Sequence, residues 1–186
     1  HREEGVSFRN VVTFNLDEYL PMPKESEQSY HYFMHHHLFD HIDIDPKNIH
    51  IPDGTLEWDE IDKFCRDYEK AIEAAGGIDL QILGIGRTGH IGFNEPGSFI
   101  TSQTRKVFLN DLTIKDAIKD FGSRNLVPTK AITMGVGTIM QARRVILMAW
   151  GEKKAPIIKA TVEGRVSDSV PATFLQMHSN VQFIID

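Results

Sequence analysis

Apolar residues along the chain fall into short runs that alternate with amphipathic stretches. Apolar runs of strand length occur at 11–16, 49–52, 78–85, 130–134, 144–150 and 181–185. Helical spacing of apolar residues, or a short helical stretch, occurs at 29–42, 56–75, 113–121, 153–163 and 172–178. Strands that are apolar on both faces and alternate with helices are typical of a parallel sheet covered on both sides. The sequence therefore predicts an α/β, three-layer, Rossmann-like fold with an open, mostly parallel sheet and helices on both faces.

Length and composition fit one domain. The chain has 186 residues, 41% of them hydrophobic, which is enough to bury one core. No internal repeat, low-complexity tract or linker divides it, so we expect residues 1–186 to form a single domain. The chain starts with His1 rather than Met and enters a predicted strand almost at once, and we therefore expect its beginning to be a cut.

The charge balance excludes one class of partner. Acidic residues number 26 against 20 basic ones, a net charge of -6, so no basic field is available to hold a nucleic acid. The lone cysteine, Cys65, cannot form an internal disulfide, and the composition is compatible with a cytoplasmic location. No apolar run approaches the roughly 20 residues that span a bilayer, so we expect no membrane partner.

A carboxylate pair follows the first predicted strand. In open parallel sheets, ligands bind beyond the carboxyl ends of the strands. Asp17 and Glu18 lie at such an end, where partial desolvation can tune an acid for general-base work. A solvated turn with a helix cap is the alternative interpretation. In either case the pair is expected to lie in a loop.

A glycine-rich loop follows the middle strand. Gly84, Gly86 and Gly89 fit the spacing of dinucleotide-binding folds, but two more glycines and a proline stand where the required helix would run. The alternative is that these glycines let the backbone approach a small ligand closely. His90 and Glu95 in the same loop are a candidate acid/base pair, because a carboxylate fixes the tautomer of a histidine and favours its cation.

Nine histidines raise the question of a metal site. His31 and His35 share a predicted helix face, but the metalloprotease pattern needs Glu beside the first His, and position 32 is Tyr. We therefore expect packing or surface roles and no metal.

Two lysines follow the strand at 144–150. Lys153 and Lys154 begin a predicted helix, where free backbone N–H groups and ammonium charge suit a phosphate. A surface pair is the alternative, although it opposes the helix dipole.

Four segments, in this order, form a recognisable set: VVTFNLDEY, GHIGFNEPGS, AITMGVGT and GEKKAPIIKATVEG. The set closely resembles the glucosamine-6-phosphate deaminase family, from about Val6 to the end of the chain. That family converts glucosamine 6-phosphate and water into fructose 6-phosphate and ammonia, without an organic cofactor. The resemblance implies an enzyme with no cofactor and with an amino-sugar phosphate as its small-molecule partner.

The resemblance also implies roles for residues. Asp17, with Glu18 beside it, would take the C2 proton of the substrate, and His90, supported by Glu95, would open the pyranose ring. Lys154 would bind the substrate phosphate, and the neighbouring substrate-binding positions are Gly86, Gly89 and Arg87. Ser98 and Arg105 match positions that, in regulated members, bind an activating N-acetylglucosamine 6-phosphate at a subunit interface, which leaves a homo-oligomer open.

Two departures from the family pattern stand out. Family members usually read Asp-Gly-His, whereas this chain has Thr88 before Gly89 and His90, preceded by Arg87. A hydroxyl cannot supply the missing negative charge, so we expect His90 to be less basic unless Glu95 compensates. The helix, strand and phosphate-binding loop with which family members begin are also expected to be absent before Val6.

Two other functions remain as alternatives. A sugar-phosphate-binding regulatory domain that has lost turnover would account for Thr88 and the absent front loop. A 6-phosphogluconolactonase-like hydrolase would share the fold, but its glycine-rich loop differs after the histidine. The retained Asp17, His90 and Glu95 favour the enzyme, because a pure sensor needs no base beneath C2.

Overall fold

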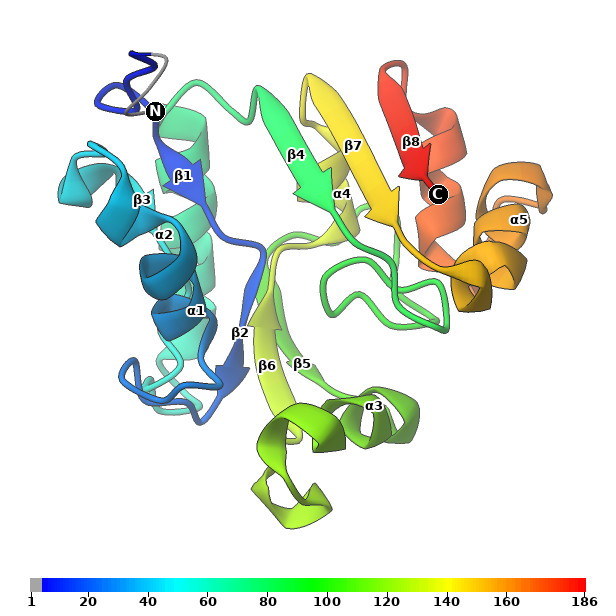
Figure 1. Ribbon diagram of the computed structural model, residues 1–186, viewed down its shortest axis with the longest axis horizontal. Coiled ribbons are helices and arrows are strands. Elements are labelled where there is room, and N and C mark those ends of the chain that lie inside the picture. The colour runs from blue at the N-terminus through cyan, green and yellow to red at the C-terminus, as the bar shows by residue number, and fades with distance from the viewer. Residues whose placement is uncertain (1–4) are drawn as a thin grey trace.

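The computed structural model describes residues 5–186, so His1 lies outside the described residues. The strands of the described residues fall into three sheets (Figure 1). One parallel sheet has the order β4 (Leu80–Leu83), β7 (Arg144–Ala149), β8 (Val181–Ile185). A second parallel pair joins β1 (Thr13–Phe14) to β3 (Ile49–His50). The third sheet is antiparallel, in the order β2 (Asp17–Leu20), β6 (Lys130–Thr133), β5 (Arg105–Phe108).

The α/β, Rossmann-like class is therefore confirmed, and the antiparallel sheet is an addition that the apolar runs did not predict. Strand β5 was not predicted either. The predicted loop at Asp17 and Glu18 is wrong, because these residues begin strand β2. Tyr19 and Leu20 on the same strand are buried in two different clusters of the core, which explains why the segment is extended rather than looped.

Four α-helices of the described residues overlap predicted stretches: α1 (Tyr30–His37), α2 (Ile61–Ala74), α3 (Asp111–Phe121) and α5 (Ala155–Glu163). Helix α3 begins two residues before the predicted stretch, and the other three are shorter than predicted. The short helix α4 (Val136–Met140) was not predicted. Tight 3₁₀ turns are η1 (Phe39–His41), η2 (Pro46–Asn48), η3 (Arg124–Leu126), η4 (Glu152–Lys154) and η5 (Pro171–Met177). The predicted helix at 172–178 is thus a 3₁₀ segment. Within residues 5–186, no helix has the length and apolar character needed to cross a membrane.

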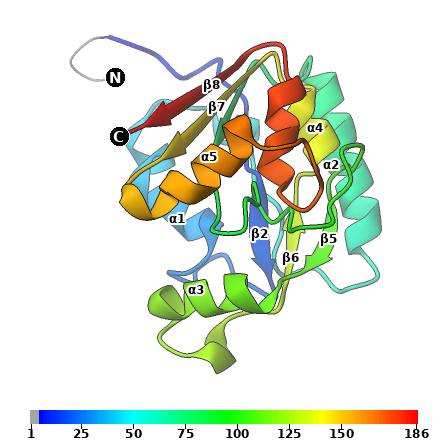
Figure 2. The same cartoon turned by 90° about the vertical axis from the view of Figure 1, so that its right-hand side faces the viewer.

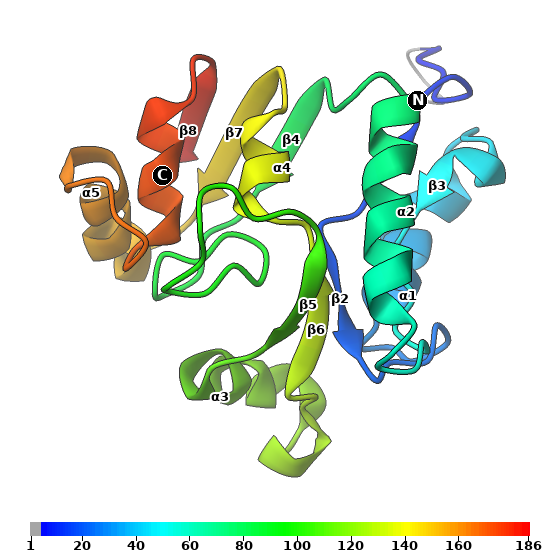
Figure 3. The same ribbon diagram turned by 180° about the vertical axis from the view of Figure 1, so that it is seen from behind.

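Helices lie on both sides of β1 and β2, with α1 on one side and α2 on the other (Figures 1 and 3). Over the parallel sheet of β4, β7 and β8, α4 and η5 cover one face (Figure 3). Leu83 and Leu147 point into that covered core, whose burial of apolar area is the main stabilising term. On the opposite face, Leu80 and Ile82 are 48% and 51% exposed.

Helix α3 packs under the antiparallel sheet. Its Ile114 and Ala117 are buried against Tyr19 and Val127. The loop between β4 and β5 passes between α3 and α5 (Figures 1 and 2). This loop is the glycine-rich segment, so α3 reaches it from the opposite side to the parallel sheet.

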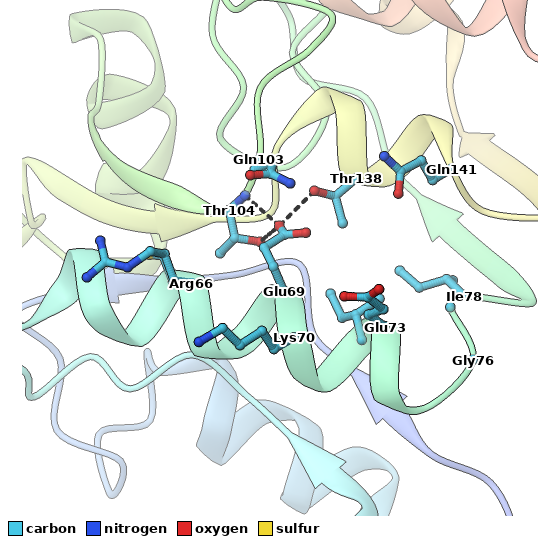
Figure 4. A pocket seen from close by; sticks show the side chains of 13 residues that line it. Arg66, Glu69, Lys70, Glu73, Gly76, Ile78, Gln103, Thr104, Thr138 and Gln141 are labelled. Atoms are coloured by element: carbon cyan, nitrogen blue, oxygen red, sulfur yellow. Dashed lines mark hydrogen bonds between the residues drawn. The ribbon is translucent and has the colours of Figure 1, made fainter.

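A single carboxylate fastens α2 to its neighbours. Glu69 on α2 accepts hydrogen bonds from the backbone N–H of Thr104 at 2.7 Å and from the hydroxyls of Thr104 and Thr138 (Figure 4). These groups line a pocket of about 660 Å³ between α2, α4 and the segment before β5. None of the predicted site residues lines it. Glu69 therefore ties α2 to the segment before β5 and to α4.

Removing this carboxylate should destabilise the fold. Glu69→Ala leaves two hydroxyls and one amide without their acceptor, which should lower the free energy of unfolding by about 1–3 kcal/mol. Urea denaturation followed by circular dichroism measures it. Glu69→Gln keeps an acceptor oxygen and should lose less. Equal stability of Glu69→Ala and the unaltered protein would contradict the fastening role.

Candidate active site

Asp17 lies at the start of β2, facing the glycine-rich loop. In the antiparallel register it is opposite Thr133 on β6. The hydroxyl of Thr133 accepts the backbone N–H of Phe93 at 3.0 Å, which fixes the loop to the sheet. A β-carbon at Gly92 would lie 3.3 Å from Oδ2 of Asp17 and 3.0 Å from the Thr133 hydroxyl, so the loop backbone approaches both.

The environment of Asp17 suits a base. Burial raises the pKa of Asp17 to about 7, and repulsion from the Glu18 carboxylate adds to the rise. None of the described residues donates a hydrogen bond that would stabilise the charged form. A carboxylate with a pKa near neutrality can both accept and return a proton at pH 7.

Glu18 has a different task. It is almost fully buried, and its carboxylate accepts the backbone N–H groups of Tyr19, Tyr30 and His31 at 2.9, 3.1 and 3.0 Å. Tyr30 and His31 are the first residues of α1, so Glu18 occupies the N-terminus of that helix beside the N-cap Ser29. Burial raises the pKa of Glu18, although these three bonds favour its ionised form. The Glu18 carboxylate therefore joins strand β2 to the N-terminus of α1.

His90 and Glu95 form the expected pair. Nδ1 of His90 is 3.3 Å from Oε2 of Glu95 and 3.0 Å from the hydroxyl of Thr88. Burial of Glu95 favours its neutral form, but hydrogen bonds from His90 and Thr113 outweigh this and hold the pKa of Glu95 below its usual value. The Thr88 hydroxyl and the Glu95 carboxylate therefore both lie beside Nδ1 of His90, and the negative charge at this nitrogen comes from Glu95.

The glycines shape the backbone around the histidine. Gly86 donates its N–H to the carbonyl of His90 at 2.9 Å, and Gly89, with φ +78°, donates to the carbonyl of Gly86 at 3.0 Å. A β-carbon at Gly86 would lie 2.0 Å from Nε2 of His90. No helix starts at these glycines, in agreement with the argument against a dinucleotide site. Because Gly86 has no β-carbon, the backbone can pass close to the His90 ring.

Two cations flank the loop. Nζ of Lys154, in η4 after β7, donates to the carbonyl of Ile85 at 2.6 Å, which places its ammonium group at the start of the loop. Arg87 forms an exposed ion pair with Asp116 of α3 at 3.1 Å. Lys154 has further donors for an anion, whereas Arg87 links the loop to α3.

Ser98 and Arg105 are brought together at the other end of the loop. Arg105 donates to Oδ1 of Asn94 at 2.8 Å and to the Ser98 hydroxyl at 3.1 Å. Asn94, which the sequence reasoning missed, is buried and donates to the carbonyls of Ile91 and Met134. No local pattern marks Asn94, because its three partners lie on different segments.

The histidine-rich helix α1 holds no metal-type arrangement among the residues that the structure describes. The rings of His31 and His35 stack with centroids 4.6 Å apart, and His35 pairs with Asp40 at 2.9 Å. These contacts are local to the helix and its following turn.

Comparison with known proteins decides the family. The sequence model described as glucosamine-6-phosphate isomerases/6-phosphogluconolactonase matches residues 1–184. The chain belongs to this family. A glucosamine-6-phosphate deaminase from Thermoanaerobacter sp. (strain X514) is 51% identical over all 186 residues, which cover 73% of that protein. A glucosamine-6-phosphate deaminase-like protein from Bacteroides thetaiotaomicron is 50% identical over the whole chain, which covers 28% of its length.

Solved structures agree on the fold. The structure of a monomeric glucosamine-6-phosphate deaminase superposes with a TM-score of 0.96 at 42% identity, covering the whole of this chain and 76% of that one. A 6-phosphogluconolactonase from Thermotoga maritima superposes with a TM-score of 0.73 at 23% identity, covering 99% of this chain and 77% of that one. The second likeness shows the shared fold alone.

Gly86 and Gly84 offer a matched test of the site. Gly86→Ala should displace the His90 ring, because the new β-carbon would overlap it. Gly84→Ala places its β-carbon in open space and should leave the ring where it is. The ¹H–¹⁵N spectrum of the histidine side chains reports the difference. Unchanged His90 signals in Gly86→Ala, or equal changes in both variants, would show that Gly86 does not support the ring.

Proposed function

We propose that the protein converts glucosamine 6-phosphate and water into fructose 6-phosphate and ammonia, by an aldose–ketose isomerisation coupled to deamination. The observation that carries the proposal is a carboxylate with a pKa of about 7 facing the loop that bears the His90–Glu95 pair. Membership of the family and the names of the 51% and 50% identical relatives support it.

The proposed reaction begins with ring opening. His90 takes the proton of the C1 hydroxyl and returns one to the ring oxygen as the bond between C1 and that oxygen breaks, which leaves an aldehyde. Glu95 stabilises the imidazolium that forms between these transfers, because its carboxylate lies beside Nδ1. Nε2 is the nitrogen that remains for the substrate.

Asp17 then moves the carbon-bound proton. Its carboxylate takes the proton from C2, and a proton of the substrate ammonium passes to O1, which gives an enolamine. The protonated Asp17 then returns its proton to C1, which gives a protonated imine at C2. Water adds to the imine and ammonia leaves, so the ketose remains. The same group gives and takes the proton, and a pKa close to the working pH is what this shuttle needs.

Lys154 would hold the phosphate in this scheme. Its ammonium group is already oriented by the Ile85 carbonyl, so little freedom is lost when an anion binds. The dianionic phosphate carries most of the charge of the substrate, and an ammonium group at the loop offsets that charge.

Regulation and location belong to the same proposal. Ser98 and Arg105 would receive an activating sugar phosphate, and Arg105 would exchange its present bonds to Asn94 and Ser98 for bonds to that phosphate. A role in amino-sugar catabolism in the cytoplasm is consistent with the proposed reaction and with the single buried cysteine.

Asp17→Asn should abolish turnover while leaving substrate binding largely intact. An amide cannot accept the C2 proton, so we expect a loss of about 100-fold or more in kcat. In the unaltered protein, kcat should rise with pH through about 7, because Asp17 must be ionised to act as the base. A coupled assay of ammonia release from glucosamine 6-phosphate measures both, and calorimetric titration measures binding.

The unaltered protein, assayed at saturating glucosamine 6-phosphate, is both the test of the proposed function and the reference for the variant. If the unaltered protein releases no ammonia, the proposed function is wrong. If Asp17→Asn releases ammonia at the unaltered rate, the base is another group.

A further inference from the structure

The N-cap and first turn of helix α3 contact the carboxylate of Glu95. Asn110 is the N-cap of α3, and its Oδ1 accepts the backbone N–H of Thr113 at 2.8 Å. The same side chain turns its Nδ2 outward and donates to Oε2 of Glu95 at 2.7 Å. The hydroxyl of Thr113 donates to Oε1 of Glu95 at 2.5 Å. One side chain therefore caps the helix and binds Glu95 at once.

These bonds determine the orientation of Glu95. Both of its oxygens are held by α3, and Oε2 is shared with Nδ1 of His90 at 3.3 Å. The side chains of Glu95 and His90 are only 13% and 17% exposed, so water can replace few of these contacts. A carboxylate bound at both oxygens cannot rotate about its last torsion without losing a hydrogen bond.

A second contact joins α3 to the same loop. Arg87, three residues before His90, pairs with Asp116, which lies one turn after Thr113. The loop is thus held to α3 on both sides of the histidine. Sequence separations of 15 and 18 residues between Glu95 and its two partners mean that only the folded position of α3 brings them together.

We propose that Asn110 and Thr113 are positioning residues that set the orientation of Glu95 and, through it, of His90, so that ring opening depends on α3 being docked against the loop. This inference rests on the proposed function and adds to it a link between the catalytic pair and a separate helix. The first turn of α3 acts through Glu95 and does not touch the reacting atoms.

Substitutions at Thr113 can distinguish the positioning of Glu95 from the stability of helix α3. The cap bond to α3 uses the backbone N–H of Thr113, whereas Glu95 is bound by its hydroxyl. Thr113→Val removes the hydroxyl and keeps the size, the β-branch and the N–H. Thr113→Ser keeps the hydroxyl and loses a methyl group. The two variants therefore divide the contact with Glu95 from the packing of the helix.

Steady-state kinetics of ammonia release from glucosamine 6-phosphate by the full chain tests the proposal. In Thr113→Val we expect kcat to fall about tenfold with KM within about twofold, since one hydrogen bond to a charged group is lost. Thr113→Ser should restore most of the rate. A wild-type kcat in Thr113→Val, or an equal loss in Thr113→Ser, would overturn the proposal.

Titration of Glu95 gives a readout that a purely structural role would not move. The groups that face Glu95 are His90, Asn110 and Thr113, with the Arg87–Asp116 pair at the edge. Loss of the Thr113 hydrogen bond should raise the pKa of Glu95, whereas the acidic limb of the kcat profile, which depends on Asp17, should stay at about pH 7 in all three proteins. A displaced acidic limb in Thr113→Val would show that the hydroxyl acts on Asp17 and not through Glu95, and would contradict the proposal.

A measurement without activity distinguishes this inference from the proposed function. If the unaltered protein releases no ammonia, the proposed function fails, and the ¹³C titration of the Glu95 side-chain carboxyl still reports its hydrogen bonding. The midpoint should rise in Thr113→Val and stay unchanged in Thr113→Ser. Equal midpoints in Thr113→Val and the unaltered protein would overturn the positioning role. Circular dichroism and urea denaturation confirm that each variant is folded.

Discussion

Burial of the Glu18 carboxylate depends on three backbone amides, and the geometry of the site follows from them. A buried charge without such partners would cost several kcal/mol. By accepting the N–H groups at the start of α1, Glu18 joins that helix to β2 and fixes the strand that carries Asp17. The pairing of Asp17 with Thr133 on β6 then places the carboxylate under the glycine-rich loop.

Two adjacent carboxylates thereby acquire different chemistry. Glu18 receives three hydrogen bonds, which favour its charged form, whereas Asp17 receives none from the described residues and has the charge of Glu18 beside it. The Glu18 carboxylate therefore adds to the rise in the pKa of Asp17. The pKa of a third carboxylate, Glu95, is instead lowered by its hydrogen bonds with His90 and Thr113. Environment, and not residue type, therefore gives these three carboxylates different protonation behaviour.

The sequence predicted those features that depend on residues close together in the chain. The strands β6, β7 and β8 and the helix α2 followed from apolar periodicity, and Asp17, His90 and Glu95 followed from motifs. The antiparallel pairing of β2 and β5 with β6 was not predicted, because no run of residues encodes its pairing partner. Likewise, Asn110 and Thr113 form a recognisable N-cap, but their second role depends on a carboxylate 15 and 18 residues away.

The claim that Asp17 is a base poised near neutrality can be tested on that one group. Side-chain ¹³C NMR of the carboxyl carbons, with Asp17→Asn to assign the signal, gives its titration midpoint directly. The account predicts a midpoint at about pH 7. A midpoint near 4, the value of an ordinary exposed aspartate, would contradict it.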